Sequence, residues 1–418
     1  MQQLTDGRDT VEAAPPVSDA TPREVRCLHV IASMDATHGG DVRATADLCT
    51  TLTFLGAPCE IATLDGGGAA GSSTAVHPQD VPVHRFAPSF PRRLGNSMQL
   101  ARWLHRHARD FDLLEVHGVF CATSLLAASA ARRSHVPFIV HPHGSLDPFD
   151  LRKHRALKRL LGPFFDRMLL RPARALVFTS PVEMANANSF GAPTPRFNVP
   201  PPILNDPGTG DRDAFRARID VGAATFVLLF MSRIDYKKGL VRTLRALARL
   251  RDDAIDAVLV IAGSGDSAYE ATVEAEVERL GIDAHVHFIG FVDGQDKVDA
   301  FAGADAFVLA SDNENFGVVV VEALRAGLPV VISDQVAIAA DLGVTGAAVV
   351  VEPDDEATAA GIATLARDRR RAAAIADAGR HAAATLYDWR AVVGPRQRAL
   401  RSSIVCPDSR HGAHAEVH

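Results

Sequence analysis

Two glutamates lie eight residues apart in the segment SDNENFGVVVVEALRAGLPVV, which begins at Ser311. The apolar run AFVLA comes directly before it, so the pattern predicts a strand, a turn that contains Glu314, and a helix from about Gly317. The amides at the start of a helix lack partners inside it and carry partial positive charge, which favours a bound phosphate. Glu322 follows four valines, and a buried carboxylate there needs partners such as the two hydroxyls of a ribose. The alternative is a loop carboxylate at Glu314 and a solvated helix residue at Glu322.

Basic side chains form a second candidate site in the segment FMSRIDYKKGL. Arg233 lies at the end of a predicted strand, and Lys237 and Lys238 precede a helix that is predicted to begin near Gly239. Parallel sheets bind ligands at the carboxyl ends of their strands, where two cations would neutralise a diphosphate and stabilise it as a leaving group. The alternative is a solvated loop with surface lysines.

Glycines and histidines after two other predicted strands are weaker signals. Gly39 and Gly40 follow the first strand and permit a close approach of the backbone to a phosphate, but the full GxGxxG pattern is missing. His141 and His143 follow the run PFIV, which places them at the edge of a sheet. An HxH pair can ligate a metal, yet no second cluster of His, Asp or Glu has a matching placement.

Length and composition describe a globular protein of two to three domains. The chain has 418 residues, of which 47% are hydrophobic and 22% charged, and these values exclude a mostly disordered chain. The net charge of -6 excludes a global positive field for nucleic acid, and no apolar run reaches the roughly 20 residues of a membrane span. The five cysteines lack CxxC spacing, which predicts neither a disulfide framework nor a zinc site and favours the cytoplasm.

Short apolar runs alternate with longer stretches of helical periodicity, which predicts βαβ units around parallel sheets and an α/β fold. Strands are predicted from Cys27 and at 60–64, 113–117, 138–141, 175–179, 226–231, 257–262, 285–289, 306–309 and 330–332. Three prolines at 200–202 and the polar run NDPGTGDRD interrupt this alternation as a linker would. The predicted organisation is a disordered tail over 1–24, α/β domains over 25–204 and 205–385, an Ala/Arg-rich helix to about residue 401, and a disordered tail over 402–418.

These motifs resemble the family-4 retaining glycosyltransferases, which have two facing Rossmann-like domains with a cleft between them, the GT-B architecture. The resemblance covers roughly Leu28 to Trp389, and its most specific part is the E-x7-E element of Glu314 and Glu322. It implies an N-terminal acceptor domain and a C-terminal nucleotide-sugar donor domain. The segment YDWRAVV resembles the late helix that returns to the N-terminal domain in this family, and we expect that helix over 386–401.

The resemblance also implies roles for individual residues. Glu322 is expected to hold the donor ribose, Glu314 to contact the transferred sugar, and Arg233 and Lys238 to bind the diphosphate. His143, within HPHGSLDP, is expected to face the sugar from the acceptor domain. The implied catalytic residues are Glu314, His143, Arg233 and Lys238. The implied donor-binding residues are Gly39, Gly40, Arg233, Lys238, Gly290, Val292, Glu314, Asn315, Phe316, Gly317 and Glu322.

The implied activity is the metal-independent transfer of a sugar, such as a hexose, from a nucleotide-diphosphate donor to an acceptor hydroxyl with retention at the anomeric carbon. It would serve glycan, polysaccharide or glycoconjugate biosynthesis, with a carbohydrate, lipid-linked or small-molecule acceptor. No cofactor and no metal are expected, because neither DxD string, at 110–112 and 211–213, follows an apolar strand. Two alternatives stay open, a nucleotide-sugar epimerase of the same architecture and a noncatalytic protein that binds a nucleotide sugar. A phosphorylase with a Schiff-base lysine is disfavoured, because few of the basic residues are lysines.

A basic stretch over 151–174 carries eight Lys or Arg residues and one acid, Asp166, which gives a local charge of +7. Leucines and phenylalanines interleave with the basic residues and predict an amphipathic helix. Two interpretations stay open. The helix rests on anionic lipid and presents the domain to a lipid-linked acceptor, which places the protein on the inner face of the membrane. Alternatively, its apolar stripe packs on its own domain and its basic face is solvated.

Overall fold

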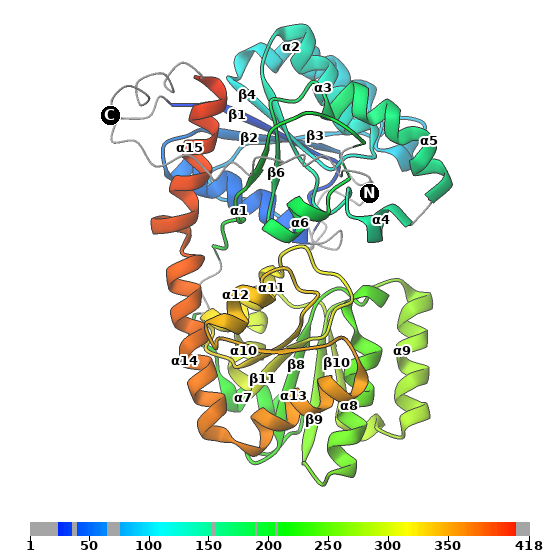
Figure 1. Ribbon diagram of the computed structural model, residues 1–418, viewed down its shortest axis with the longest axis vertical. Coiled ribbons are helices and arrows are strands. Elements are labelled where there is room, and N and C mark those ends of the chain that lie inside the picture. Colours follow the sequence, from blue (N-terminus) through cyan, green and yellow to red (C-terminus); the bar gives the residue numbers. More distant parts are fainter. Residues whose placement is uncertain are drawn as a thin grey trace, which may run out of the picture. The chain divides into compact units, whose positions relative to one another are not determined.

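The computed structural model describes residues 24–35, 40–64, 76–152, 155–188, 190–204 and 208–406 (Figure 1). The chain divides into two compact units, each with one parallel sheet. The first unit comprises the described parts of 1–34, 45–200 and 393–418, and the second comprises those of 35–44 and 201–392. Among the described residues, no helix is both long enough and apolar enough to cross a membrane.

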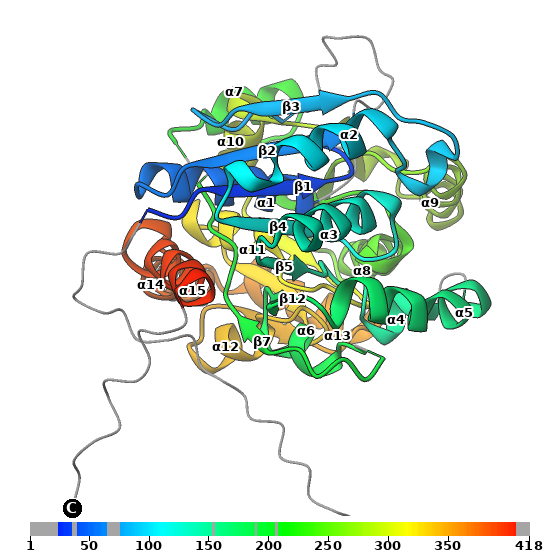
Figure 2. The same ribbon diagram turned by 90° about the horizontal axis from the view of Figure 1, so that it is seen from above.

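A seven-stranded sheet forms the centre of the first unit, in the order β3-β2-β1-β4-β5-β6-β7. Figure 2 shows the strands from β3 to β5 following one another across this sheet. The strands are β1 (Cys27–Ile31), β2 (Cys59–Leu64), β3 (Val83–Phe86), β4 (Leu113–His117), β5 (Phe138–His141), β6 (Ala175–Phe178) and β7 (Arg196–Asn198). The helices of this unit are α1 (Gly40–Phe54) from Thr45 onward, α2 (Met98–His107), α3 (Ala122–Ser134), α4 (Pro148–Arg152), α5 (Arg155–Phe165), α6 (Pro181–Asn186) and α15 (Gly394–Val405).

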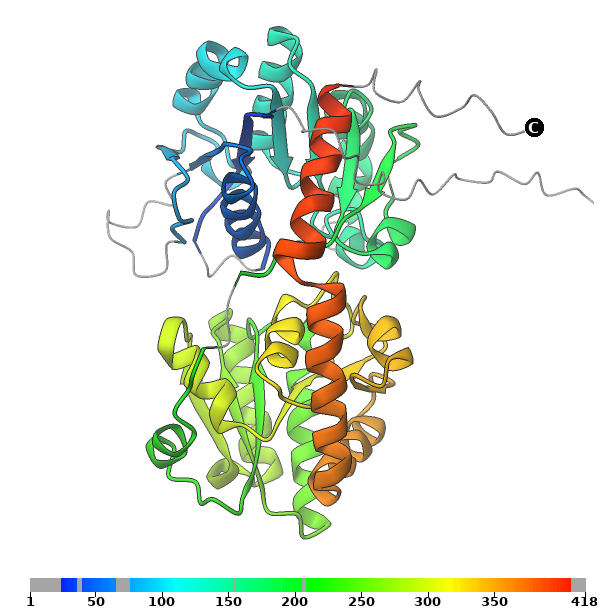
Figure 3. The ribbon, with the colours of Figure 1, turned by 90° about the vertical axis from the view of Figure 1, so that its left-hand side faces the viewer.

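The two faces of the first sheet differ in chemistry. Alternate strand residues, among them Leu28, Leu114 and Val140, pack with residues of α2 and α3 in an apolar core. The residues between them place His29 and Glu115 on the opposite face, where α1 and α15 supply side-chain partners. Figure 3 shows α15, in red, running along the first unit. One internal face of this unit is therefore apolar, and the other, called the polar face below, carries buried polar side chains among apolar ones.

The second unit has a six-stranded parallel sheet in the order β10-β9-β8-β11-β12-β13, which is the strand order of a Rossmann fold. The strands are β8 (Phe226–Met231), β9 (Ala257–Ala262), β10 (Val286–Gly290), β11 (Ala306–Leu309), β12 (Val330–Ser333) and β13 (Val349–Val351). The helices are α7 (Arg212–Arg218), α8 (Leu240–Asp252), α9 (Ser267–Leu280), α10 (Gly294–Gly303), α11 (Val318–Arg325), α12 (Ala339–Val344), α13 (Asp355–Arg367) and α14 (Arg369–Leu386).

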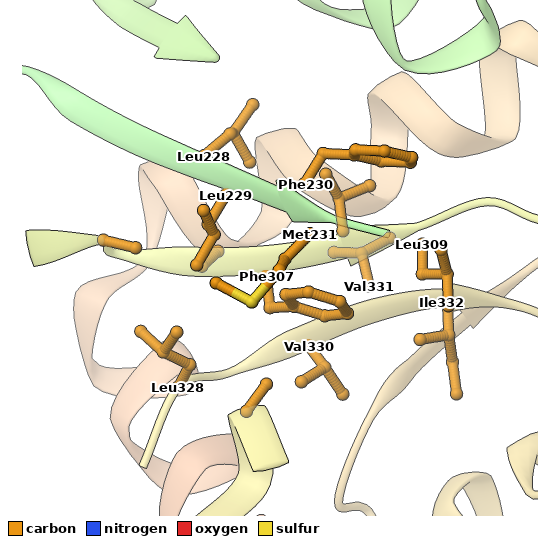
Figure 4. Packing of buried hydrophobic residues seen from close by; sticks show 14 of the residues in the cluster. Leu228, Leu229, Phe230, Met231, Phe307, Leu309, Leu328, Val330, Val331 and Ile332 are labelled. Carbon is orange, nitrogen blue, oxygen red and sulfur yellow. The ribbon is translucent and has the colours of Figure 1, made fainter. Parts of the chain in front are cut away.

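The central strands of the second sheet are buried on both faces. Phe307 of β11 is in register with Leu229 of β8 on one side and with Val330 of β12 on the other (Figure 4). Such burial explains why these strands are continuous apolar runs rather than alternating ones. The strand order reverses between β8 and β11, so the loops that follow these two strands form a topological switch point, where open α/β sheets bind ligands.

The predicted α/β class with two Rossmann-like sheets is confirmed. Every predicted strand is present, although the one predicted at 285–289 begins one residue later, at Val286. The strands β3, β7 and β13 were not predicted. They have only three or four residues and lie at sheet edges, so they are too short for a periodic pattern.

The C-terminal helical region is more broken and extends further than predicted. In place of one helix there are α13, α14, a π-helical turn over Trp389–Val393, and α15. The prediction of a disordered tail from residue 402 is wrong for 402–405, because α15 continues to Val405. Leu400 and Arg401 are buried and hold this last part of the helix on the first unit. Of the predicted tail over 1–24, all but Glu24 lies outside the described residues, as do residues 407–418.

Candidate functional site

The loop after β8 carries the predicted cations and is shaped by its own side chains. The carboxylate of Asp235 accepts a hydrogen bond from the Lys237 amide at 3.0 Å and caps a 3₁₀ turn over Tyr236–Lys238. Gly239 has a φ of +66°, and a Cβ at this position would lie 1.9 Å from the Ala310 carbonyl oxygen. Only glycine therefore allows the start of α8 to come this close to the end of β11.

Backbone hydrogen bonds hold the loop after β11 in place. The Asp312 amide donates to a carbonyl oxygen in the loop after β8 at 2.7 Å. The Glu314 amide donates to the Gln335 carbonyl oxygen at 3.1 Å, and the Glu314 carbonyl oxygen accepts from the Ala337 amide at 2.9 Å. The helix α11 begins directly after Gly317, whose φ of +88° suits glycine. The strand, turn and helix expected around Glu314 are therefore present.

Lys238 and Glu314 form an ion pair where these two loops meet. Their side chains are 13% and 17% exposed, so the pair is largely shielded from water. Arg233 is exposed and has no ion pair or side-chain hydrogen bond among the described residues. The loops at the switch point of the second sheet thus carry the shielded cation Lys238, the carboxylate of Glu314, and the exposed cation Arg233, which is open to an anionic ligand.

Glu322 on α11 is 5% exposed, which excludes the interpretation as a solvated helix residue. Its carboxylate accepts a hydrogen bond from the Lys297 ammonium of α10 at 2.7 Å. No sequence pattern pointed to Lys297, because it lies 25 residues before Glu322 and the two side chains meet only through the fold. A protein cation therefore balances the charge of this buried carboxylate.

The other predicted donor-binding residues of the second unit lie around these loops. At the end of β10, the Gly290 carbonyl oxygen accepts a hydrogen bond at 2.7 Å from the backbone of the loop after β9. Val292, two residues further on, is half-buried. Asn315 is half-buried beside Glu314. Phe316 is buried, and its ring meets the Tyr387 ring edge-on at a centroid distance of 5.5 Å. The Phe316 side chain therefore packs inside the protein.

His143 lies in the turn after β5 of the first unit and has a φ of +49°, which is unusual for a residue other than glycine. The turn is held by Glu183, whose carboxylate accepts a hydrogen bond from the Gly144 amide at 2.7 Å. Gly40, the other described candidate from the N-terminal half, is the exposed first residue of α1. Gly39 lies outside the described residues.

A cluster of buried charged and polar groups surrounds Glu115 on β4. Its two oxygens accept hydrogen bonds from the Arg401 guanidinium of α15 at 2.5 and 2.6 Å, and one of them also contacts His141 at 2.8 Å. His29 lies 3.5 Å from the other oxygen. Burial alone would raise the pKa of Glu115, but Arg401, followed by the two histidines, holds this pKa well below its usual range. The ion pair anchors α15 on the first unit.

The buried histidines predict that the first unit loses stability as the pH falls. Burial lowers the pKa of His29 and of His141 to about 4, from an ordinary value of about 6.5. Below pH 6.5 the unfolded chain takes up protons that the folded chain does not, so stability that is present above this pH is lost toward pH 4. We expect a loss of about 2 kcal/mol per histidine between pH 7.5 and pH 5.

Urea unfolding curves at several pH values measure this loss. The fluorescence of Trp103 reports on the first unit when Trp389 is replaced by phenylalanine. The variant His141→Gln should show a flatter dependence on pH, whereas His105→Gln, at an exposed position, should leave the dependence unchanged. Equal stability of the first unit at pH 7.5 and pH 5 would contradict the burial of neutral histidines.

Two groups of side chains on the polar face have the spacing of metal ligands. They are His29, Cys49 and Cys59, and His29, Glu115 and His117, with ligand atoms in each group within 4.8 Å of one another. Both oxygens of Glu115 already accept hydrogen bonds from protein groups. Burial raises the pKa of the Cys59 thiol well above its ordinary value, which disfavours the thiolate that a metal needs. These contacts favour a hydrogen-bonded cluster as the role of this face.

Two family models match most of the chain. "Glycosyl transferase 4-like domain" matches residues 39–202, and "Glycosyl transferases group 1" matches residues 211–382. The second match contains all of the predicted residues after β8, β10 and β11.

Curated relatives match parts of the chain at identities of 32% to 39%. A GDP-mannose-dependent alpha-(1-6)-phosphatidylinositol monomannoside mannosyltransferase of Mycolicibacterium smegmatis is 32% identical over 216 residues, which are 49% of this chain and 56% of the relative. A phosphatidyl-myo-inositol mannosyltransferase of Mycobacterium tuberculosis is 36% identical over 183 residues, 42% of this chain and 47% of the relative. An uncharacterized glycosyltransferase of Methanocaldococcus jannaschii is 39% identical over 119 residues, 28% of this chain and 30% of that protein. The matched part thus spans between about a third and just over half of these relatives.

Solved structures share the fold along nearly the whole chain. The HepE protein of Anabaena in complex with UDP and glucose has a TM-score of 0.72 at 20% identity, and the match covers 90% of this chain and 99% of that one. WaaG, a glycosyltransferase involved in lipopolysaccharide biosynthesis, has a TM-score of 0.68 at 17% identity, with 91% and 99% covered. At these identities the likeness concerns the fold, and it agrees with the two Rossmann-like sheets. The chain therefore belongs to the GT-B glycosyltransferases, with a 4-like domain followed by a group 1 domain.

Proposed function

We propose that the protein transfers a sugar from a nucleotide-diphosphate donor to an acceptor hydroxyl, with retention of the anomeric configuration. The observation that carries this proposal is the pair of Lys238 and Glu314 at the switch point of the second sheet, directly before α11. A diphosphate is the natural ligand of a shielded cation at a helix N-terminus, and a sugar hydroxyl is the natural ligand of a carboxylate. The GDP-mannose-dependent relative supports a nucleotide-sugar donor.

Three groups would stabilise the charge that develops on the departing diphosphate. Arg233 is open to solvent and can bind phosphate directly. Lys238 would exchange its partner Glu314 for a phosphate oxygen, and the amides at the start of α11 would supply further donors. Glu314, released from Lys238, would then accept a hydroxyl of the transferred sugar. The leaving phosphate would take the proton of the acceptor hydroxyl on the same face, so that these steps need no metal.

Glu322 is proposed to accept the two hydroxyls of the donor ribose. Its carboxylate is almost fully buried, and Lys297 holds it in one orientation from α10. A ribose contact is made equally in the ground state and in the transition state, so it contributes to binding rather than to turnover. Glu314, in contrast, would contact the part of the donor that reacts.

A thermal-shift panel with UDP, GDP, ADP and their sugars tests the donor site, because a ligand that binds the folded state raises the melting temperature. We expect one base to give the largest shift. Glu322→Gln should weaken binding of that donor about tenfold with little change in kcat, and Glu314→Gln should lower kcat more than binding. The matched control is Glu274→Gln, at an exposed position of α9. Equal effects of both substitutions on kcat with unchanged KM would contradict the two roles.

A lipid-linked acceptor is the second part of the proposal, and the outer face of α5 supports it. Leu157, Leu160 and Phe164 follow one another at helical spacing and are 53%, 76% and 50% exposed. Arg155 and Arg159, on the same helix, are exposed as well. An exposed apolar stripe beside basic side chains suits an anionic lipid surface.

The anchoring side of α5 is distinct from this stripe. Phe165 is buried in the apolar core of the first unit, and Leu161 packs against that core. Packing of α5 on its own domain thus explains the positions of Phe165 and Leu161. It does not explain the stripe of Leu157, Leu160 and Phe164, which the described residues leave exposed. The mannosyltransferases of phosphatidylinositol lipids among the relatives support an acceptor of this kind.

Flotation with liposomes tests the membrane surface. We expect the protein to float with anionic but not with zwitterionic liposomes, and to be released when salt shortens the Debye length from about 10 Å at 0.1 M to about 3 Å at 1 M. Arg155→Glu with Arg159→Glu should abolish flotation and leave the thermal shift by the donor unchanged. The same charge reversal at the exposed Arg132 and Arg133 of α3 is the matched control. No flotation on anionic liposomes at low salt would favour a soluble acceptor.

A further inference from the structure

A chain of imidazoles leads from the half-buried His143 to the buried polar face of the first sheet. His143 Nε2 lies 2.8 Å from His117 Nδ1, and His117 Nε2 lies 3.0 Å from His29 Nδ1. His29 Nε2 in turn lies 3.5 Å from a carboxylate oxygen of Glu115. The strand register pairs His29 of β1 with Glu115 of β4, so the sheet itself fixes the order of these groups.

The charge of Glu115 decides which nitrogen of each ring carries a hydrogen. Glu115 is ionised beside Arg401, and His29 Nε2 faces it at 3.5 Å without forming a hydrogen bond. A hydrogen on Nε2 is attracted to the carboxylate and a lone pair there is repelled, so the hydrogen is assigned to His29 Nε2 and His29 Nδ1 accepts.

His117 then donates from Nε2 and accepts at Nδ1, which faces both His143 Nε2 at 2.8 Å and the Thr45 hydroxyl at 3.2 Å. The shorter contact needs a hydrogen on His143 Nε2, because two lone pairs would otherwise face each other. Burial lowers the pKa of His29 to about 4 and that of His117 well below its ordinary value, so both rings are neutral at pH 7. A neutral imidazole has one donor and one acceptor, which makes this order self-consistent.

The backbone of the turn after β5 places His143 at the outer end of this row of imidazoles. His143 has a φ of +49°, and hydrogen bonds to Glu183 stabilise the turn that holds it. The Glu183 carboxylate accepts one from the Gly144 amide at 2.7 Å and one from the Thr179 amide at 2.8 Å. His143 Nδ1 has no hydrogen-bond partner within the described part of the chain. Residues in sparsely populated backbone conformations cluster at functional sites, where the surroundings hold them in place.

We propose that His29 and His117 are positioning residues, which hold His143 as the Nε2–H tautomer with its Nδ1 lone pair ready to accept a substrate hydroxyl. The inference rests on the proposed function, because a sugar or acceptor hydroxyl is the donor that this lone pair would meet. The opposite tautomers would place the lone pair of His29 Nε2 against the Glu115 carboxylate inside the buried face, which is unfavourable. The charge of Glu115 therefore sets the tautomer of His29, then that of His117, and finally that of His143 in the turn after β5.

Long-range ¹H–¹⁵N correlation spectra of the full chain with ¹⁵N-labelled histidine measure these tautomers directly. At pH 7.5 we expect His143, His117 and His29 all as Nε2–H tautomers. The His143→Asn variant identifies the His143 signals by their loss. A His143 ring with its hydrogen on Nδ1 in the wild-type protein would overturn the proposal, whether or not the protein transfers sugar.

Two variants of His117 test its effect on turnover. His117→Leu removes the acceptor for His143 and should lower kcat about tenfold or more, with the donor KM changed less than about twofold. His117→Asn keeps an oxygen near the place of Nδ1 and should recover most of the loss. Unchanged kcat and an unchanged His143 tautomer in His117→Leu would overturn the positioning role. A wild-type protein with the expected tautomers but without sugar transfer would instead refute the proposed function.

Discussion

Replacing Lys238 by alanine is expected to lower kcat about a hundredfold, the scale for the loss of one preorganised charge-stabilising group. Lys238 is 13% exposed, so its charge acts where water screens it little. The substitution also leaves Glu314 without its cation, and this carboxylate would then repel the diphosphate of the donor. Steady-state kinetics with the donor that gives the largest thermal shift measure the effect.

Lys237→Ala is the matched control, because Lys237 lies in the same turn and has no role in the proposed site. Its kcat should stay within about threefold of the wild type. Arg233→Ala should approach the effect of Lys238→Ala, since a departing diphosphate carries more charge than one cation balances. Near-normal kcat/KM in both Lys238→Ala and Arg233→Ala would contradict the diphosphate role of this loop.

Replacing Arg401 by methionine is expected to destabilise the first unit by about 3–5 kcal/mol, the usual cost of removing one partner of a buried ion pair. The side chains of Arg401 and Glu115 are 1% and 0% exposed, so the carboxylate would stay buried without its cation. Loss of this ion pair should also release the end of α15 from the sheet. Urea unfolding followed by Trp103 fluorescence measures it.

Arg396→Met, on the exposed side of the same helix, is the matched control and should change the unfolding free energy by less than about 0.5 kcal/mol. Neutralising the remaining carboxylate in the double variant Glu115→Gln with Arg401→Met should recover part of the loss, because no buried charge then lacks a partner. A change below about 1 kcal/mol in Arg401→Met would show that this pair does not anchor α15.

The second unit was largely predictable from the sequence because its signals are local. The strand before Ser311, the turn at Glu314 and the helix after Gly317 follow one another within one segment, and the structure has all three. The ion pair of Glu314 with Lys238 joins two such segments. The sequence predicted that each segment lies at the carboxyl ends of the strands, but it did not predict the contact between the two side chains. Lys297 could not be found in this way, because its contact with Glu322 depends on how α10 and α11 pack.

The polar face of the first unit was missed for a different reason. The strand LLEVH places Glu115 and His117 two residues apart, and the strand CLHVI carries one histidine, His29, at its centre, so these polar positions were present in the sequence. Read singly, His29, Glu115 and His117 are ordinary buried residues, and only the register of β1 with β4 brings them together. Arg401, the partner of Glu115, was predicted to be the last residue before a disordered tail, so no sequence argument linked it to Glu115 across 286 positions.

The slow hydrolysis of the donor in the absence of an acceptor tests the central claim most directly, because water then replaces the unknown acceptor hydroxyl. Proton NMR at early times shows which anomer of the sugar is released before the anomers equilibrate in solution. Retaining transfer predicts that an α-linked donor first releases the α anomer together with the nucleoside diphosphate, and that Lys238→Ala slows this release. First release of the β anomer, or an isomerised sugar that is still linked to its nucleotide as an epimerase would leave it, would contradict the account.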